Sequence, residues 1–277
     1  FNEERVKQGR DLANKLWNAS RLILMRVAEV EPDAGAAATV EDRWIVSRLE
    51  RLTAQATEQF DGFRFSHAAL DLYGAFWSEL CDWYLELVKP RLYEEDNEQV
   101  SGVLLWALDR TLRLLHPVMP FVTEEIWSLM PEARGSAARA GEGIRGERGL
   151  LAVAEWPRAS GGSIDEAAEA DVSRLIEAVT SLRRYRDEVG AKPSVPVRGR
   201  LAAGGYEAVA DHLARLARFE LVGDDASNGD VLATVPVPGG GVQVLPSDAF
   251  DPAEVERRRA ARRELLAAEI ERAERKL

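Results

Sequence analysis

The chain has 277 residues, enough for one large domain or two ordinary ones, and its 46% hydrophobic residues can fill a sizeable core. It contains no apolar run long enough for a transmembrane helix and no signal peptide, and its single cysteine, Cys81, excludes an internal disulfide and fits a reducing, cytoplasmic setting. The net charge of −11 argues against a protein that coats nucleic acid in bulk, but basic residues outnumber acidic ones in 1–26, 181–200 and 251–277, which leaves room for local basic surfaces.

The first predicted helix runs from about Gly9 to Val30 and has two unlike faces. Its apolar residues recur at helical spacing and are expected in the core: Leu12, Leu16, Ala19 and Ile23. The opposite side and its flank carry mainly amides and cations: Arg10, Asn14, Lys15, Asn18, Arg21 and Leu22. Asparagine is a poor helix former, but it offers both a donor and an acceptor. This face is therefore either an ordinary solvated surface or one that binds a partner with hydrogen-bonding edges and negative charge, such as a nucleic acid.

Four further helical segments are predicted before residue 130, and they cover about 39–60, 66–90, 97–115 and 121–129. The aromatic turn at 60–65 is expected to be buried, Ser66 to cap the next helix, and Pro90 to end or kink it. Because the connections are short, 1–157 is predicted to form an antiparallel helical bundle. Six tryptophans occupy core-like helix positions, with base stacking as the alternative role: Trp17, Trp44, Trp77, Trp83, Trp106 and Trp127.

Residues 131–149 are rich in Gly, Ala, Arg and Glu and predict a mobile surface loop. Within them, 141–146 match the pattern G-x-G-x-x-G. The match is interpreted as chance, because no strand precedes it and no helix follows it.

The segment 163–250 predicts a small α+β subdomain. Ser163 and Glu166 have the spacing of a capping box at the start of its first helix. Four strand-like segments follow, at 195–202, 219–222, 231–237 and 242–245, with a helix near 206–218.

The last segment, 251–277, predicts a charged helix with a short apolar seam, which is half of a coiled coil without its partner strand. The chain also lacks an initiator methionine and a helix-ending signal at Leu277. We therefore expect a piece of a longer protein.

No group of residues in the sequence predicts covalent or metal chemistry. His67, His116 and His212 lie far apart without metal-ligand spacing, and no P-loop, G-x-S-x-G or H-E-x-x-H pattern occurs. No catalytic and no metal-binding residue is therefore predicted.

Four stretches resemble the anticodon-binding domain of the valyl-tRNA synthetase family: GRDLANKLWNASR at 9–21, DRWIVSRL at 42–49, CDWYLELVKP at 81–90 and LLHPVMPFVTEEIW at 114–127. The last is shared with the isoleucyl and leucyl enzymes. The resemblance implies a mainly α fold: a class I synthetase anticodon-binding bundle, then a small α+β subdomain and the first helix of a coiled-coil arm. It also implies anticodon contacts at Lys15, Asn18 and Leu22, a position where the family often has Phe.

The family's nucleotide-binding signatures, H-I-G-H and K-M-S-K-S, are absent from the chain. The resemblance therefore implies that ATP and magnesium bind in a catalytic core outside these residues, that the fragment has no cofactor of its own, and that it is inactive alone.

The predicted function is tRNA recognition within a valine–tRNA ligase, with tRNA(Val) and the enzyme's own catalytic and editing domains as partners. The candidate tRNA-binding residues are Arg10, Asn14, Lys15, Asn18, Arg21 and Leu22. We expect a cytoplasmic monomer that binds no membrane. The alternatives are the equivalent part of an isoleucyl enzyme and a helical scaffold that binds protein.

Overall fold

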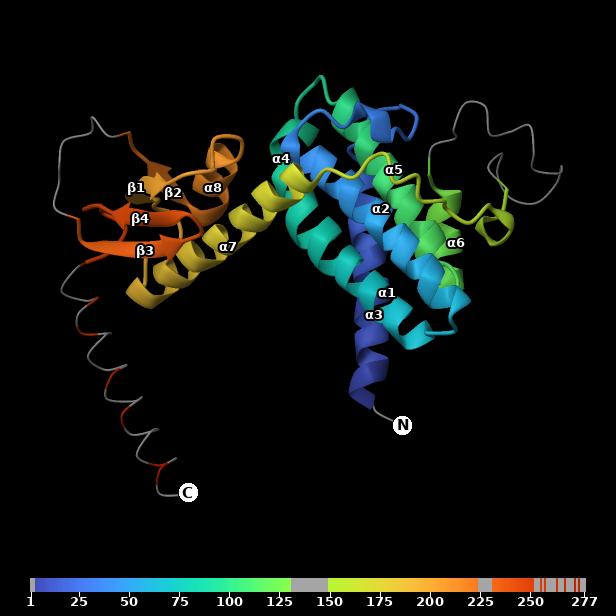
Figure 1. Cartoon of the computed structure of the whole chain (residues 1–277), viewed down its shortest axis with the longest axis horizontal. Coiled ribbons are helices and arrows are strands. Elements are labelled where there is room, and N and C mark those ends of the chain that lie inside the picture. The colour runs from blue at the N-terminus through green and yellow to red at the C-terminus, as the bar shows by residue number, and fades with distance from the viewer. Residues whose placement is uncertain are drawn as a thin grey trace. The chain divides into compact units, whose positions relative to one another are not determined.

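The computed structural model describes residues 3–130, 149–223 and 231–251, together with isolated positions between 255 and 274. Contacts within the chain divide it into two compact units, Phe1–Glu169 and Ala170–Leu277. The first unit is helical, and the second is built on a four-stranded sheet (Figure 1). This architecture confirms the predicted class of a helical bundle followed by a small α+β part. The predicted segment bounds 1–157, 163–250 and 251–277 stay a prediction.

Helix α1, Glu3–Leu24, is amphipathic as predicted. Its apolar stripe is buried: Leu12, Leu16, Ala19 and Ile23. Leu16 and Ile23 are 0% exposed, so the side of α1 that faces the bundle is fixed by these residues.

The predicted end of α1 at Val30 is wrong, because the helix ends at Leu24. Side chains far away in the chain form hydrogen bonds with the backbone that follows. Ser101 Oγ accepts a hydrogen bond from the amide of Ala28 at 2.9 Å. Asn97 Nδ2 donates to the carbonyl of Arg26 at 3.1 Å. These bonds satisfy backbone groups that would otherwise continue the helix.

Helix α2, Val40–Asp61, begins where the sequence predicts, with Thr39 as its N-cap. The Thr39 hydroxyl accepts a hydrogen bond from the amide of Asp42 at 3.4 Å. Glu41 and Asp42 in the first turn suit the positive end of the helix dipole. Both carboxylates are nonetheless buried, at 3 and 0% exposed.

The helix predicted over 66–90 is three consecutive helical segments: α3 (Phe65–Gly74), η2 (Ala75–Tyr84) and α4 (Leu85–Leu92). The middle segment, η2, is a π-helix. Pro90 lies inside α4 and does not end it. The predicted cap at Ser66 is wrong, since α3 begins at Phe65 and Arg64 occupies the N-cap position without a side-chain hydrogen bond.

The turn between α2 and α3 does not bury its aromatic rings as predicted. Phe63 is 80% exposed and Phe65 is 55% exposed. Backbone hydrogen bonds close the turn. The amide of Phe63 donates to the carbonyl of Phe60 at 3.0 Å, and the amide of Arg64 donates to the carbonyl of Gln59 at 2.7 Å. Phe63 adopts a φ of 56°, which a bulky residue rarely does.

A buried ion-pair network joins α2 to α4. One guanidinium nitrogen of Arg91, Nη1, lies 2.9 Å from Asp42 Oδ2 and 3.1 Å from Glu41 Oε1. The Tyr84 hydroxyl donates to Asp42 Oδ1 at 2.8 Å. Burial, followed by the charge of Asp42, raises the pKa of Tyr84 well above its ordinary value, so this hydroxyl remains a donor.

Helices α5, Glu98–Leu115, and α6, Pro120–Ser128, confirm the last two predicted helices of the bundle. The leucines predicted to face inward in α5 are buried: Leu105, Leu108, Leu112 and Leu115. The short helices η1, Ala34–Ala36, and η4, Leu151–Val153, complete the first unit. Glu124 of α6 holds η4 by accepting the amide of Leu151 at 2.9 Å.

The second unit contains most of α7, Glu166–Val189, and a sheet of strand order β2-β1-β4-β3. Its elements agree with the predicted ones: β1 (Val197–Ala203), α8 (Ala210–Ala217), β2 (Phe219–Leu221), β3 (Ala233–Val237) and β4 (Gly240–Val244). Strand β1 pairs with β2 in parallel through the α8 crossover, and the other pairs are antiparallel. Asp165 replaces the predicted Ser163 as the residue that caps α7, since its Oδ1 accepts the amide of Ala168 at 2.9 Å.

Three predictions fall largely or wholly outside the described residues: the loop at 131–149, the pattern at 141–146, and the coiled-coil seam of 251–277. In the described part of the chain, no helix is both long and apolar enough to cross a membrane.

Candidate nucleic-acid interface

The side of α1 opposite its buried stripe is the candidate interface. Four candidate residues are exposed: Arg10, Asn14, Asn18 and Arg21. Because residues three and four apart are neighbours on a helix, the last three share one face. Leu22, at its edge, is 39% exposed. The structure therefore brings two amides and a guanidinium together at the surface.

Lys15 differs from the other candidates, because its ammonium is already engaged. Its Nζ lies 2.6 Å from Asp82 Oδ1 and 4.0 Å from the centre of the Trp77 ring. Trp77 is in turn stacked on Tyr73, with ring centres 5.4 Å apart. Lys15 is less accessible than its predicted place on the flank of the polar face implies, since only 24% of its side chain is exposed beside Asp82 and Trp77 of η2.

Arg10 forms an ion pair with its neighbour Asp11 at 3.1 Å. Both side chains are largely exposed, at 64 and 44%. A pair of this kind contributes about 0–1 kcal/mol, because water screens it and both side chains lose conformational freedom. Arg10 can therefore exchange its partner for a phosphate easily.

Trp17 is a residue of this surface that the sequence interpretation placed in the core. Its side chain is 39% exposed, whereas Trp44 and Trp127 are 3% exposed and confirm their core assignment. The spacing in the sequence could have shown that Trp17 lies on the surface, because it is three residues from Asn14 and four from Arg21, both on the polar face. Met25, 66% exposed and four residues after Arg21, lies just past the end of α1 and continues the same surface by about one turn.

These groups supply the three kinds of contact that unpaired RNA offers. Amides can bond the edges of splayed bases, guanidinium groups can bond phosphates, and an exposed indole can stack on a base. The arrangement suits a single-stranded loop better than a duplex, because stacking needs an unpaired base.

The rest of the described chain offers little chemistry of another kind. Within 3–130, 149–223 and 231–251, no cluster of His, Cys, Asp and Glu has a geometry that could hold a metal ion. Burial raises the pKa of Cys81 to about 12, so its thiol stays protonated at neutral pH and is a poor nucleophile.

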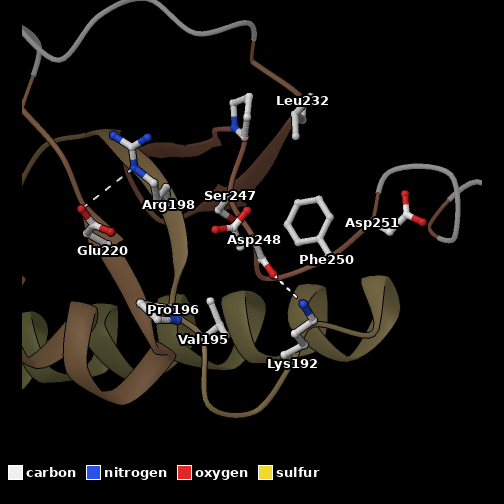
Figure 2. Close-up of a pocket in the computed structure, with 11 residues that line it drawn as sticks. Lys192, Val195, Pro196, Arg198, Glu220, Leu232, Ser247, Asp248, Phe250 and Asp251 are labelled. Carbon is white, nitrogen blue, oxygen red and sulfur yellow. Dashed lines mark hydrogen bonds and ion pairs between the residues drawn. The ribbon is translucent and has the colours of Figure 1, made fainter.

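A cavity of about 1110 Å³ lies in the second unit, at the end of the sheet (Figure 2). Both cations that line it are engaged, since Lys192 Nζ donates to the carbonyl of Asp248 at 3.2 Å and Arg198 lies 4.0 Å from Glu220. The carboxylates of Asp248 and Asp251 also line it. This balance of charges does not favour a polyanion there.

Comparison with known proteins identifies the domain. A family model described as the anticodon-binding domain of tRNA ligase matches residues 42–201, more than half of the chain. The chain belongs to this family. The matched stretch of the anticodon-binding domain begins after α1, so the candidate residues of α1 lie outside it and stay a prediction.

The anticodon-binding domain is similar to several valine–tRNA ligases. The chain is 38% identical over 206 residues to the valine–tRNA ligase of Fervidobacterium nodosum, and the match covers 69% of this chain and 22% of that enzyme. The enzyme of Enterococcus faecalis is 39% identical over 203 residues, covering 71% and 22%. That of Mycobacterium leprae is 39% identical over 201 residues, covering 72% and 21%. The matched region thus spans about a fifth of each relative's length.

Proposed function

We propose that this chain is the tRNA-recognition part of a valine–tRNA ligase, and that α1 binds the anticodon stem and loop of tRNA(Val). The observation that carries the proposal is the exposed face of Asn14, Asn18 and Arg21 beside Trp17, in a chain of the anticodon-binding family. The names of the relatives favour valine over the isoleucine alternative.

In the whole enzyme, this part supports the ATP-dependent attachment of L-valine to tRNA(Val). ATP and magnesium would act in the catalytic core, and the bundle would work together with that core and with the editing domain. The 277-residue chain by itself is proposed to be inactive.

The surface suggests a division of labour among its side chains. Arg10 and Arg21 attract phosphates, which supply most of the affinity for a nucleic acid. Asn14 and Asn18 bond base edges and supply specificity. Lys15 is held in place by Asp82 and Trp77, so a phosphate must compete with that carboxylate for its ammonium.

Asn18→Ala is expected to weaken binding of tRNA(Val) by roughly 5–150-fold, because a base edge loses its partner and about 1–3 kcal/mol is lost. Filter binding with tRNA(Val) and with an anticodon-swapped tRNA measures both affinity and discrimination. Gln99→Ala, which removes an exposed amide from α5, is the matched control and should bind like the parent chain. Undiminished discrimination by the Asn18 variant would place the reading site elsewhere.

The same assay separates the alternatives. An isoleucyl fragment would prefer tRNA(Ile), and a protein-binding scaffold would bind neither tRNA. Lys15→Ala should reduce the salt dependence of binding by about one unit of slope if its ammonium reaches a phosphate. An unchanged salt dependence would mean that Lys15 does not contact a phosphate and only makes its contacts with η2.

Trp17→Leu is expected to weaken tRNA(Val) binding by about 1–3 kcal/mol, because leucine keeps an apolar side chain but cannot stack on a base. Trp17→Phe is the control, and it should retain most of the affinity because it keeps an aromatic face. Thermal melts should show little change in either variant. Equal affinity of the Leu and Phe variants would rule out stacking.

A further inference from the structure

The ion pair between Lys15 of α1 and Asp82 of η2 lies at the edge of the candidate tRNA-binding surface. Lys15 Nζ and Asp82 Oδ1 are 2.6 Å apart, and the centre of the Trp77 ring is 4.0 Å from the same nitrogen. Asn18 follows Lys15 by three residues, so the two side chains are neighbours on α1. The pair therefore lies beside an amide that is proposed to bond a base edge.

The carboxylate is the more accessible partner of this pair. The side chain of Asp82 is 50% exposed, whereas that of Lys15 is 24% exposed. The edge of the surface therefore presents more carboxylate than ammonium to an approaching polyanion. For a phosphate this contact is unfavourable, because like charges repel each other and the ammonium must first give up its partner.

Helix η2 is built so that two of its side chains reach one ammonium. Trp77 and Asp82 are five residues apart, a spacing that would separate them by about 140° around the axis of an α-helix. The hydrogen bonds of a π-helix join residues five apart, so in η2 these two side chains lie on one side. The indole is also stacked on Tyr73, with ring centres 5.4 Å apart. Lys15 is therefore held by two groups whose positions the helix fixes.

Two further acidic residues lie within about one turn of this pair, and both are engaged by other cations. Glu79, the second carboxylate of η2, accepts hydrogen bonds from Arg48 at 2.8 and 3.1 Å. Asp11, one turn before Lys15, forms an ion pair with the residue that precedes it, at 3.1 Å. Asp82 is therefore the carboxylate that controls whether the charge of Lys15 is available to an RNA.

Phosphates and bases contribute differently to RNA binding. Phosphate contacts supply affinity for every RNA, whereas contacts to base edges distinguish one sequence from another. An unpaired ammonium beside Asn18 would attract phosphates from any RNA, and these would compete with a base for the same place. A neutral ion pair attracts phosphates less and does not repel an uncharged base edge.

We propose that Asp82 is a specificity-determining residue of this surface. By occupying the ammonium of Lys15, it lowers the affinity for phosphates at this edge of the surface and leaves the place beside Asn18 to a base. The proposal rests on the proposed tRNA binding by α1, and it deepens that function by naming a residue that acts against unselected RNA.

Asp82→Asn tests the proposal, because it removes the charge and keeps the size of the side chain. Filter binding of poly(U) and of tRNA(Val) is measured at several salt concentrations. Poly(U) should bind roughly three- to tenfold more tightly, since the released ammonium gains a phosphate and the repulsion is lost. The salt dependence of poly(U) binding should steepen by about 0.7 in slope, the value for one phosphate of a single strand. The affinity for tRNA(Val) should rise clearly less, so the preference for tRNA(Val) falls.

Three further variants identify the cause. With Lys15→Met already present, Asp82→Asn should leave the salt dependence unchanged, because it releases no ammonium. Asp82→Glu keeps the charge and should restore the behaviour of the parent chain. Glu58→Gln breaks an exposed pair with Arg64 and removes the same charge elsewhere in the bundle, so it should leave the ratio of the two affinities unchanged. Thermal melts of all variants should stay close to that of the parent, since such pairs contribute little to stability.

Two results would overturn the proposal. One is a salt dependence of poly(U) binding that Asp82→Asn does not change, or changes equally when Lys15 is methionine. The other is an equal gain in affinity for poly(U) and tRNA(Val), which would make Asp82 a residue of general affinity. A parent chain without preference for tRNA(Val) over poly(U) would contradict the proposed function instead, and the poly(U) measurements would still show whether Asp82 withholds Lys15 from phosphates.

Discussion

Replacing Arg91 by methionine should lower the free energy of unfolding by about 3–5 kcal/mol, the loss expected when a buried ion pair loses one partner. Methionine fills similar space but leaves Asp42 and Glu41 without their cation. Burial by itself would lower the pKa of Arg91, yet the two carboxylates outweigh burial and raise it, so the charged form belongs to the folded state. Chemical denaturation monitored by circular dichroism measures the loss.

A double-mutant cycle isolates the interaction. Arg91→Met combined with Asp42→Asn should cost clearly less than the sum of the two single changes, because the second removes the stranded charge. Arg184→Met is the control, since the partner of Arg184, Glu188, is 61% exposed and the pair should contribute little. If the losses of unfolding free energy caused by the Arg91 and Asp42 substitutions were additive, the two side chains would not interact, which would contradict the ion-pair network.

Leu16→Ala is expected to destabilise the first unit by about 2–5 kcal/mol through a cavity in its core. Leu16 is 0% exposed and lies in the middle of the buried stripe of α1. Thermal and denaturant melts give the change directly. Leu16→Ala should weaken tRNA binding only by reducing the fraction of the chain that is folded.

Asn18→Ala is the paired control for Leu16→Ala. Asn18 is exposed two residues further along the same helix, so its loss should alter stability by no more than about 0.5 kcal/mol. An early melt for Asn18→Ala together with a normal melt for Leu16→Ala would mean that α1 faces the opposite way.

Periodicity in the sequence predicted most helices, because an apolar residue every three or four positions is enough to show which side is buried. The stripe of α1 and the leucines of α5 are examples. The four strands were also predicted, since turn residues bound each short apolar run.

Features that depend on distant residues could not be predicted. The end of α1 is set by Ser101 and Asn97, which lie more than 70 positions away in the chain. The partial burial of Lys15 depends on Asp82, 67 positions away. A single sequence does not show which residues far apart will meet, so the pattern of α1 could show its polar face but not which members of that face are already bonded.

The π-helix η2 makes the length of the chain adjustable at one place. Its hydrogen bonds reach five residues back instead of four, so each turn holds more residues than a turn of α-helix. Deleting one residue between Ala75 and Tyr84 would let the remaining residues form an ordinary α-helix, in which each residue turns further about the axis. This larger turn makes up for most of the rotation lost with the deleted residue, so Arg91 would stay on the side of the helix that faces Asp42. One-residue deletions should therefore be better tolerated in η2 than in α2, where nothing compensates for the roughly 100° of one residue, when homologous genes diverge.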